Sequence, residues 1–332
     1  MNQKIKIICT LGPSSFKKEI LQKLKKQKVD IFRINLSHTN KNEIKRKILY
    51  LRRQKIKNIC LDTEGAQIRT TLTNDSHFLK KNHIVNLSIE NKISNKKNIY
   101  LYPDFNLLSI PLKTKIFIGF EDLSLQVIKK NAKKQILVCK IIKGGYLQSK
   151  KGVHVNYPIK LKPLTEKDVY ALKLGKLLNI NYFAISFVNN HNDINEVKKI
   201  VGKKKYIISK VETLNALHDL KNIAKTSSAL LIDRGDLSRY VPIEEIPLAQ
   251  EEIIKKTKKT DKPVFIATNL LENMIENSQP TRAESNDIYS SLKQGAKGLV
   301  LAAETAIGKD PISCVTFLKR CIKVYHSKKK YK

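Results

Sequence analysis

The chain has 332 residues, a hydrophobic content of 41% and a formal net charge of +35 at pH 7. This length suffices for one barrel-sized domain with a large core and a smaller second domain. The composition is that of a folded globular protein, and no apolar run reaches the roughly 18 residues that a bilayer-spanning helix needs. We therefore expect no membrane anchor.

The positive charge raises the question of nucleic-acid binding. The lysines are spread along nearly every segment, and only nine of the 64 basic residues are arginines, the residue that most often reads bases and phosphates. No helix-turn-helix, zinc-finger or aromatic-stacking motif is visible. We expect that nucleic-acid binding is not the main function, whereas the field of the protein would attract an anionic substrate.

The N-terminal segment Met1–Cys9 lacks the layout of a signal peptide, because a charge interrupts its apolar residues. The five cysteines are odd in number and show no CxxC or Cys/His spacing. Buried thiols in a reducing compartment are the better interpretation. We therefore predict a cytoplasmic protein.

Eight short apolar runs recur along the chain, and continuous hydrophobicity is typical of strands buried on both faces. These predicted strands are Ile5–Thr10, Val29–Asn35, Asn58–Asp62, Tyr182–Val188, Tyr206–Val211, Ala229–Asp233, Pro263–Thr268 and Gly298–Ala303. Amphipathic stretches with helical spacing lie between or after them: Phe16–Lys28, Lys41–Lys55, Glu166–Leu178, Asp193–Val201, Thr213–Ile223, Pro247–Thr260, Arg282–Gln294 and Asp310–Val324. This alternation predicts an α/β fold, a (β/α)8 TIM barrel.

One interruption follows the third strand, where short β-like segments alternate with turn residues. The segments are His83–Ile89, Thr114–Ile118, Ser124–Ile128 and Gln135–Ile142. We predict a small all-β domain at residues 70–162, inserted between barrel segments 1–69 and 163–332. An insertion at this point emerges at the C-terminal face of a barrel, where active sites lie, so we expect it to act as a lid.

Lys210 and Glu212 stand at the end of the fifth predicted strand. Strand residues i and i+2 point to the same side, so a cation and a carboxylate emerge together. For these two residues alone, a structural ion pair is an equal alternative. Polar residues also follow the other strands: Thr10, Arg33, Asn35, Ser37, Asp62, Thr63, Ser186, Asp233, Asp236, Thr268, Glu304 and Thr305. So many polar groups at one face indicate a functional site.

The residue types at this face suit phosphoryl transfer. Glu212 and Asp236 lie on neighbouring strands and could share one Mg²⁺, which takes few protein ligands beside substrate oxygens. Lys210 and Arg33 supply fixed positive charge for a phosphate or a developing oxyanion. The turn at Arg234–Asp236 offers backbone N–H groups to an anion.

A second group of oxygen donors suits another cation, which we expect to be monovalent. Its members are Asn35, Ser37, Asp62 and Thr63. Ordinary helix capping by Ser37 or Asp62 is the alternative, and it is favoured when this group is considered alone.

Nine segments resemble the pyruvate kinase family, in the family's order and at the predicted strand ends. They are Ile8–Ser15, Phe32–His38, Leu61–Thr70, Gly144–Gly145 with Ser149–Val153, Ile208–Glu212, Arg234–Leu237, Ala267–Thr268, Pro280–Glu284 and Glu304–Ala306. The resemblance runs nearly end to end. It implies a glycolytic phosphotransferase that moves the phosphoryl group of phosphoenolpyruvate to ADP, giving pyruvate and ATP.

The resemblance also implies a role for each site residue. Arg33 would contact the transferring phosphoryl group, Lys210 would stabilise charge during transfer, and Mg²⁺ would bind Glu212 and Asp236. By position in the family pattern, the substrate would bind to Gly235, Asp236 and Thr268. A K⁺ ion would bind to Asn35, Ser37, Asp62 and Thr63. The nucleotide would contact Asn35, His38, Arg69 and, from the lid, Lys151.

The chain departs from the family pattern near this site. Gln67 stands where the family has Glu and removes a charge near the expected K⁺ site, so the K⁺ requirement stays open. Asp233 replaces a small residue, and an added carboxylate repels an anionic substrate unless it is paired. The lid segment Ile116–Ser124 lacks the family's acidic turn, for which Phe120–Asp122 compensate only in part. We also expect the family's C-terminal regulatory domain to be absent, because the chain ends after the eighth helix.

Two alternatives to a pyruvate kinase-like enzyme stay open. One is a catalytically impaired relative that binds a nucleotide, a metabolite or a protein partner, motivated by the altered site and the missing domain. The other is a different barrel enzyme acting on phosphoenolpyruvate or pyruvate with Mg²⁺, such as an aldolase or mutase. The inserted lid and Lys151 oppose the second, because that chemistry needs no nucleotide-facing domain. A homo-oligomer assembled through the barrel is a further expectation.

Overall fold

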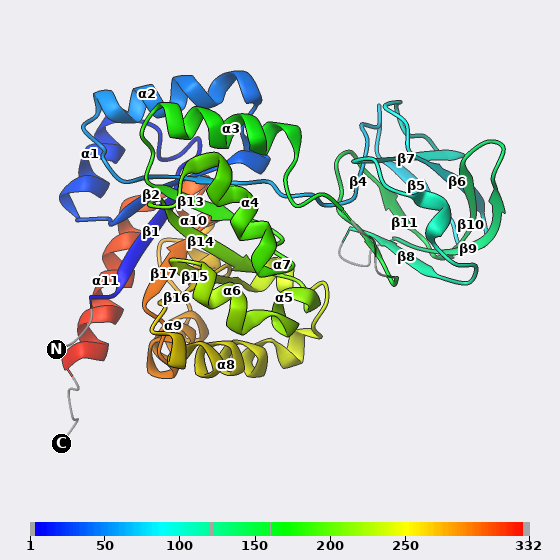
Figure 1. The fold of residues 1–332 in the computed structure, drawn as a ribbon. Coiled ribbons are helices and arrows are strands. Elements are labelled where there is room, and N and C mark those ends of the chain that lie inside the picture. Colours follow the sequence, from blue (N-terminus) through cyan, green and yellow to red (C-terminus); the bar gives the residue numbers. More distant parts are fainter. Residues whose placement is uncertain (1–3, 120–122, 158, 160, 328–332) are drawn as a thin grey trace. The chain divides into compact units, whose positions relative to one another are not determined.

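The computed structural model describes residues 4–119, 123–157, 159 and 161–327 (Figure 1). The chain forms two compact units, the first made of Met1–Gly65 with Glu166–Lys332 and the second of Ala66–Thr165. The second unit contains the predicted insertion. The expectation about Phe120–Asp122 falls outside the described residues.

Eight parallel strands close into a barrel in the first unit, which confirms the predicted (β/α)8 fold. Each predicted barrel strand contains one observed strand, because continuous apolar runs suit a position between barrel interior and outer helices. In spatial order the strands are β1 (Lys6–Thr10), β17 (Gly298–Leu301), β16 (Val264–Ala267), β15 (Ala229–Asp233), β14 (Tyr206–Val211), β13 (Tyr182–Ile185), β3 (Ile59–Asp62) and β2 (Ile31–Asn35).

Helices surround the barrel strands in Figure 1. The longer ones are α1 (Lys18–Lys26), α2 (Ile44–Arg53), α3 (Glu166–Leu177), α4 (His191–Val201), α6 (Leu220–Thr226), α8 (Ile246–Thr257), α9 (Arg282–Gln294) and α11 (Pro311–Ser327). Short turns of helix supplement them: α5 (Leu214–His218), α7 (Arg234–Leu237), α10 (Ala303–Ala306), η1 (Leu36–His38), η2 (Lys41–Glu43), η4 (Ile243–Glu245), η5 (Lys258–Thr260) and η6 (Glu272–Ile275).

The prediction of one continuous helix over Thr213–Ile223 was wrong, because the chain breaks between α5 and α6 at Asp219. The Asp219 carboxylate accepts hydrogen bonds from the backbone N–H of His191 (2.8 Å) and from the side-chain amide of Asn222 (2.7 Å). These bonds hold Asp219 at the point where α5 ends and α6 begins.

Phe265 fills the barrel interior, and Gly298 on the neighbouring strand makes room for it. The two residues are register partners on β16 and β17, and Phe265 is fully buried. A Cβ atom at position 298 would lie 2.5 Å from Phe265 Cδ1, closer than atoms can pack. The absence of a side chain at Gly298 is therefore a packing requirement.

We expect Gly298→Ala to lower the free energy of unfolding by about 1–3 kcal/mol, because overpacking forces side chains out of their preferred rotamers. Urea denaturation followed by circular dichroism measures the change. Phe265→Leu in the same chain should recover part of the loss, as contacting residues couple in a double-mutant cycle. Equal stability of Gly298→Ala and the wild type would contradict this packing argument.

The second unit is built from strands around a separate core of aliphatic residues. A seven-stranded sheet has the order β12 (Val153–Val155), β8 (Lys115–Ile118), β9 (Leu123–Asn131), β10 (Ile136–Lys143), β6 (Ile84–Ser88), β7 (Asn98–Tyr102) and β4 (Arg69–Thr70). A two-stranded sheet joins β11 (Gly145–Leu147) to β5 (His77–Leu79), and one 3₁₀ turn, η3, covers Leu107–Ser109. The alternating burial of these strands is typical of sheets with one face on a core.

The cysteines are free thiols, and four of them are buried: Cys9, Cys60, Cys139 and Cys314. Burial raises the pKa of the Cys139 and Cys314 thiols to about 12, so they are protonated at neutral pH. In the described part of the chain, no helix is long and apolar enough to cross a membrane.

Candidate functional site

Lys210 is the centre of a buried group of charges at the C-terminal ends of the barrel strands. Its ammonium nitrogen lies 2.7 Å from Glu212 Oε1 and 3.1 Å from Asp233 Oδ2, and it donates a hydrogen bond to Ser186 Oγ at 3.1 Å. Lys210 is only 5% exposed. As the i, i+2 spacing predicts, the cation and the Glu212 carboxylate lie on the same side of the chain.

Four carboxylates determine the charge state of Lys210. Burial on its own lowers the pKa of a lysine. The residues that oppose it and raise the pKa well above its ordinary value are Asp62, Glu212, Asp233 and Asp236. Lys210 is therefore charged at neutral pH, and its ammonium group is surrounded by carboxylates.

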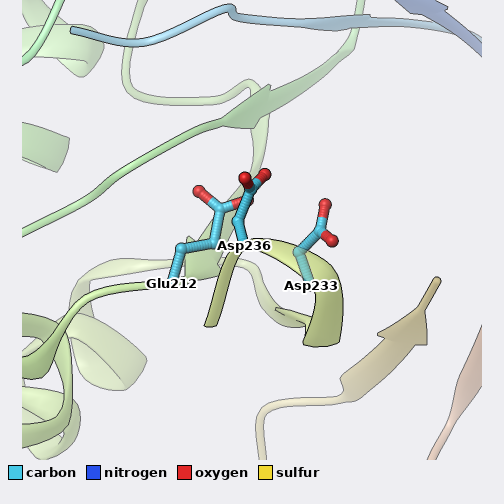
Figure 2. A group of neighbouring side chains, drawn as sticks. All are labelled: Glu212, Asp233 and Asp236. Atoms are coloured by element: carbon cyan, nitrogen blue, oxygen red, sulfur yellow. The ribbon is translucent and has the colours of Figure 1, made fainter. Parts of the chain in front are cut away.

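Glu212, Asp233 and Asp236 form a compact carboxylate group (Figure 2). One oxygen from each lies within 4.8 Å of the others. Glu212 follows β14 and is fully buried, and its Oε2 accepts a hydrogen bond from the backbone N–H of Phe187 at 2.7 Å. Asp236 lies on α7 and pairs with Arg239 at 3.1 Å. Closely spaced hard oxygen donors fit a small divalent cation such as Mg²⁺.

The Glu212 carboxyl is poised to exchange a proton for a cation. Burial raises the pKa of Glu212 to about 8; Lys210 opposes this shift, and Asp236 and Asp233 add to it. A divalent cation removes the penalty, because it supplies the positive charge that the buried carboxylate lacks.

Asp233 ends β15 and is paired on both sides. Besides Lys210, it contacts Thr268, whose hydroxyl donates to Asp233 Oδ1 at 2.6 Å. Burial by itself would raise the pKa of Asp233, but Lys210, the Thr268 hydrogen bond and Arg33 together lower it to about 2. An additional carboxylate at this position repels an anionic substrate unless a cation pairs with it. Lys210 is that cation for Asp233.

Arg33 lies on β2 and faces Lys210 across the Asp62 carboxylate, whose Oδ1 is 3.9 Å from the Lys210 ammonium nitrogen. Its Nε donates to Thr10 Oγ1 at 2.8 Å, and its Nη1 pairs with Asp62 Oδ2 at 3.0 Å. The side chain is buried at 4% exposure. Parallel pairing of β1, β2 and β3 holds the three residues side by side, so Arg33 is a second fixed cation at this end of the barrel.

Thr268 has a backbone conformation that β-branched residues rarely adopt, with φ at +78°. Strain of this kind costs on the order of 1–3 kcal/mol and needs support from its surroundings. Arg234 supplies that support: its Nε and Nη2 donate to the Thr268 carbonyl at 3.1 and 2.5 Å, and its Nη1 pairs with Asp287 at 2.7 Å. Gly235 is adjacent, and a Cβ there would lie 3.0 Å from Thr268 Cγ2.

We expect Arg234→Met to reduce turnover by about 10- to 100-fold, because a misplacement of about 1 Å at a substrate-positioning turn has effects of this size. Steady-state kinetics measures the change, with kcat and KM determined separately. Arg282→Met removes an exposed arginine from α9 and should leave both constants unchanged. An Arg234→Met variant with wild-type kinetics would show that the Thr268 turn does not depend on this guanidinium.

The predicted monovalent-cation donors are only partly brought together. Asn35 and Asp62 are register partners on β2 and β3. Asp62 Oδ1 is buried without a hydrogen-bond partner among the described residues, which leaves a lone pair for a cation. Asn35 Oδ1, however, accepts from the Ser37 backbone N–H at 2.9 Å, and Thr63 Oγ1 accepts from the Ser186 backbone N–H at 2.9 Å. The observed cap of η1 is thus Asn35, rather than Ser37 or Asp62, and cation binding by this group stays a prediction.

Asp168, in the first turn of α3, fixes the loop after β3. It is fully buried, and its carboxylate accepts from the backbone N–H groups of Glu64 (2.9 Å) and Gly65 (3.0 Å). The loop is thereby held next to α3. No local pattern reveals this contact, because its partners are about 100 residues apart in sequence.

Glu304 and Thr305 follow β17, and the side chains of both form hydrogen bonds with backbone groups of neighbouring segments. Glu304 accepts from the backbone N–H groups of Leu271 and Ala302 at 3.1 and 2.6 Å, and the Thr305 hydroxyl donates to the Thr10 carbonyl at 2.9 Å. Both side chains stabilise loops at the barrel mouth.

The residues predicted to face a nucleotide are divided between the two units. His38 is exposed on η1 in the barrel unit. Arg69 and Lys151 belong to the second unit, where the Lys151 backbone N–H donates to Thr70 Oγ1 at 2.9 Å and Arg69 Nη1 donates to the Lys150 carbonyl at 3.0 Å.

Comparison with known proteins gives consistent matches over nearly the whole chain. The family model for the barrel domain of pyruvate kinase matches residues 2–315. A pyruvate kinase of Thermotoga maritima is 37% identical over 332 residues, which cover 96% of this chain and 70% of that protein. A pyruvate kinase of Clostridium perfringens is 34% identical and also matched over 70% of its length. The chloroplastic isozyme G of Nicotiana tabacum is 32% identical, and the match covers 94% of this chain and 57% of that protein.

Proposed function

This chain belongs to the pyruvate kinase family, and from that membership we propose that it transfers the phosphoryl group of phosphoenolpyruvate to ADP, giving pyruvate and ATP. The carrying observation is the buried Lys210 cation, 2.7 Å from Glu212 in a group of three carboxylates at the strand ends. A fixed cation beside a cation-binding carboxylate group is the arrangement that phosphoryl transfer requires.

In the proposed reaction, an oxygen of the ADP β-phosphate attacks phosphorus, and the bond from phosphorus to the enol oxygen breaks. The electron pair of that bond passes to the enol oxygen, and a proton is then added to the methylene carbon, which yields pyruvate. Lys210 and Arg33 both contact the Asp62 carboxylate at the barrel mouth, and in this proposal they stabilise the charge that spreads over the phosphoryl and enolate oxygens. Their burial makes each charge more effective than it is in water.

The substrate carboxylate is proposed to bind at the start of α7. The first N–H groups of a helix have no partner within the helix, and they attract anions. Gly235 belongs to this turn and leaves space that a Cβ would fill against Thr268. Thr268 is then the neighbouring hydroxyl, oriented by its hydrogen bond to Asp233.

Glu212 and Asp236 are the residues that would hold Mg²⁺, which when bound neutralises charge on the phosphoryl oxygens and orients them. A K⁺ ion would use Asp62 Oδ1 together with oxygens of Asn35, Ser37 and Thr63. Asn35 and His38 in the barrel unit are proposed nucleotide contacts, and so are Arg69 and Lys151 in the inserted unit. A cytoplasmic location and assembly through the barrel belong to the same proposal.

A coupled assay that follows pyruvate formation from phosphoenolpyruvate, ADP and Mg²⁺ tests this function directly. Turnover that depends on both substrates and on Mg²⁺ is the expected result. Activity no greater than that of Lys210→Met would contradict it. Omission of K⁺ in a parallel series determines whether Gln67, in place of the family's Glu, has removed the monovalent-cation requirement.

A second candidate function is a binding protein that has lost turnover, and the contacts of Asp233 favour it. This carboxylate engages Lys210 at 3.1 Å and Thr268 at 2.6 Å, the two side chains that a substrate would need. Mg²⁺-dependent binding of phosphoenolpyruvate without product would support this candidate and reject the first.

Asp233→Ala separates the two functions. If the enzyme is active, we expect the KM for phosphoenolpyruvate to fall about tenfold, because one negative charge next to an anionic substrate is removed. If Asp233 has silenced the site, the same variant should gain turnover. Glu251→Ala removes an exposed carboxylate from α8 and controls for net charge. An unchanged KM and kcat would show that the paired Asp233 has no electrostatic influence on the substrate.

A further inference from the structure

A second cavity lies in the barrel unit, at the N-terminal ends of the strands and thus at the end opposite Lys210. Its volume is about 440 Å³, and it is lined where β1, β16 and β17 begin and where η5 and α9 end. Six of its 14 lining residues are lysines: Lys4, Lys6, Lys258, Lys262, Lys293 and Lys297. Volumes of this size are typical of small-molecule sites.

The lysine content of this cavity exceeds that of the chain. Nine of the 64 basic residues are arginines, so about one residue in six of the whole chain is lysine. Nearly half of the cavity lining is lysine, and Asp261 is its only acidic member. The general bias of the composition does not account for this concentration, and the charges reinforce one another across a concave surface.

Most of these charges are not neutralised by the protein. Lys4 pairs with Asp30, and the Lys6 ammonium lies 4.7 Å above the ring of Tyr206. Between residues 4 and 327, leaving out the few positions that are not described, no ion pair involves the other four: Lys258, Lys262, Lys293 and Lys297. Lys262 and Lys297 are half-buried, so an anion bound there would be partly shielded from water.

The barrel itself holds the cavity open. The Lys6 backbone N–H donates to the Lys297 carbonyl at 3.0 Å, and the Lys297 N–H donates to the Val264 carbonyl at 2.8 Å. These bonds fix the starts of three adjacent strands. The rear wall is apolar and comprises Ile254, Val264 and Phe265, all of them buried. A fixed apolar wall with a charged rim fits a ligand that is anionic at one end.

We propose that this cavity binds a small molecule carrying two or more linked phosphoryl groups. Several cations around one hollow match several adjacent negative charges, and lysine ammonium groups bind phosphate oxygens without fixed orientation. The site is separate from the proposed phosphoryl transfer, and it is tested by binding rather than by turnover. A nucleic acid fits less well, because the one aromatic ring in the lining, Phe265, is fully buried and offers no stacking surface.

Isothermal titration calorimetry on the full chain in Mg²⁺-free buffer tests the proposal. The probes are tripolyphosphate, which presents charge alone, and isopentenyl diphosphate, which adds an apolar group for the wall and is no substrate or product of the proposed phosphoryl transfer. The site variant combines Lys258→Ala, Lys262→Ala and Lys293→Ala. A matched control replaces three exposed lysines on other helices, Lys45, Lys173 and Lys221, with alanine and changes the net charge equally.

We expect at least about tenfold weaker binding of both probes by the site variant, and wild-type binding by the control, since each lost lysine removes a charge-assisted contact. Replacement of the same three lysines with arginine should preserve binding and so exclude misfolding as the cause. Equal weakening in site variant and control would overturn the proposal in favour of nonspecific attraction. Absence of probe binding, or undiminished binding by the site variant, would also overturn it. Lysine-dependent binding of a dodecameric oligothymidylate without binding of either probe would assign the surface to nucleic acid instead.

Discussion

Lys210→Met is expected to reduce the rate of pyruvate formation by about 10³-fold or more. Removal of one preorganised donor to a developing oxyanion costs about 10²–10³-fold, and Lys210 carries a full charge in a buried site. Methionine keeps the length of the side chain and removes the charge. Stopped and coupled assays at saturating phosphoenolpyruvate and ADP measure kcat.

The loss has to be separated from misfolding, because Lys210 is also the buried partner of Glu212 and Asp233. Removal of one partner of a buried ion pair destabilises a protein by about 3–5 kcal/mol. Circular dichroism and thermal unfolding identify the temperature range in which Lys210→Met is folded, and kinetics are compared there. Lys221→Met, at an exposed position on α6, should have wild-type kinetics. Turnover of folded Lys210→Met within tenfold of the wild type would remove Lys210 from the mechanism.

Glu212→Gln is expected to weaken divalent-cation binding by about 100-fold and to reduce turnover at fixed Mg²⁺ accordingly. Even outer-shell partners of a metal contribute 10- to 100-fold in affinity, and Glu212 would be a direct ligand. Glutamine preserves the side-chain shape and an oxygen that can accept from the Phe187 N–H. Electron paramagnetic resonance of free Mn²⁺ measures affinity without reference to activity.

The pH dependence of the same titration gives a second readout. Burial raises the pKa of Glu212 to about 8, and the proton and the cation compete for this carboxylate. Wild-type Mn²⁺ affinity should therefore rise with pH between about 6.5 and 8.5, and the rise should be shallower in Glu212→Gln. Glu304→Gln alters a buried carboxylate that binds two backbone N–H groups, so it should lower the Tm and leave Mn²⁺ affinity intact. Identical affinity and pH profile in Glu212→Gln and the wild type would exclude Glu212 as a ligand.

The barrel was predictable because its strands are encoded locally. Runs such as Tyr206–Val211 and Ala229–Asp233 are mostly apolar, and the structure reproduces both ranges. The relation of Lys210 to Glu212 is also local, since it depends only on the two-residue repeat of a strand. The break at Asp219 is not predictable from the local sequence, because no glycine or proline marks it. The hydrogen bond that Asp219 accepts comes from His191, which is distant in sequence.

The second partners of the site residues could not be predicted in this way. Asp233 was recognised as an additional charge, but its pairing with Lys210 depends on the adjacency of β14 and β15. Arg234 was read only as part of a backbone turn, whereas its guanidinium supports Thr268 from 34 residues away. Such contacts are determined by the closed barrel as a whole and not by any window of sequence.

The closure of the barrel also determines which parts of the protein can fold while the chain is still being synthesised. β1 completes its pairing only with β17, where Cys9 meets Leu301, so the first strand keeps an open edge until nearly all of the chain has been made. β3 likewise waits for β13, where Cys60 meets Tyr182. The inserted unit, by contrast, is one uninterrupted stretch with its own core, and it can fold while the second half of the barrel is still being synthesised. During translation the inserted β domain can thus be folded while the barrel segments on both sides of it are still incomplete. The unpaired edges of β1 and β3 are then the surfaces that a nascent-chain chaperone would need to cover.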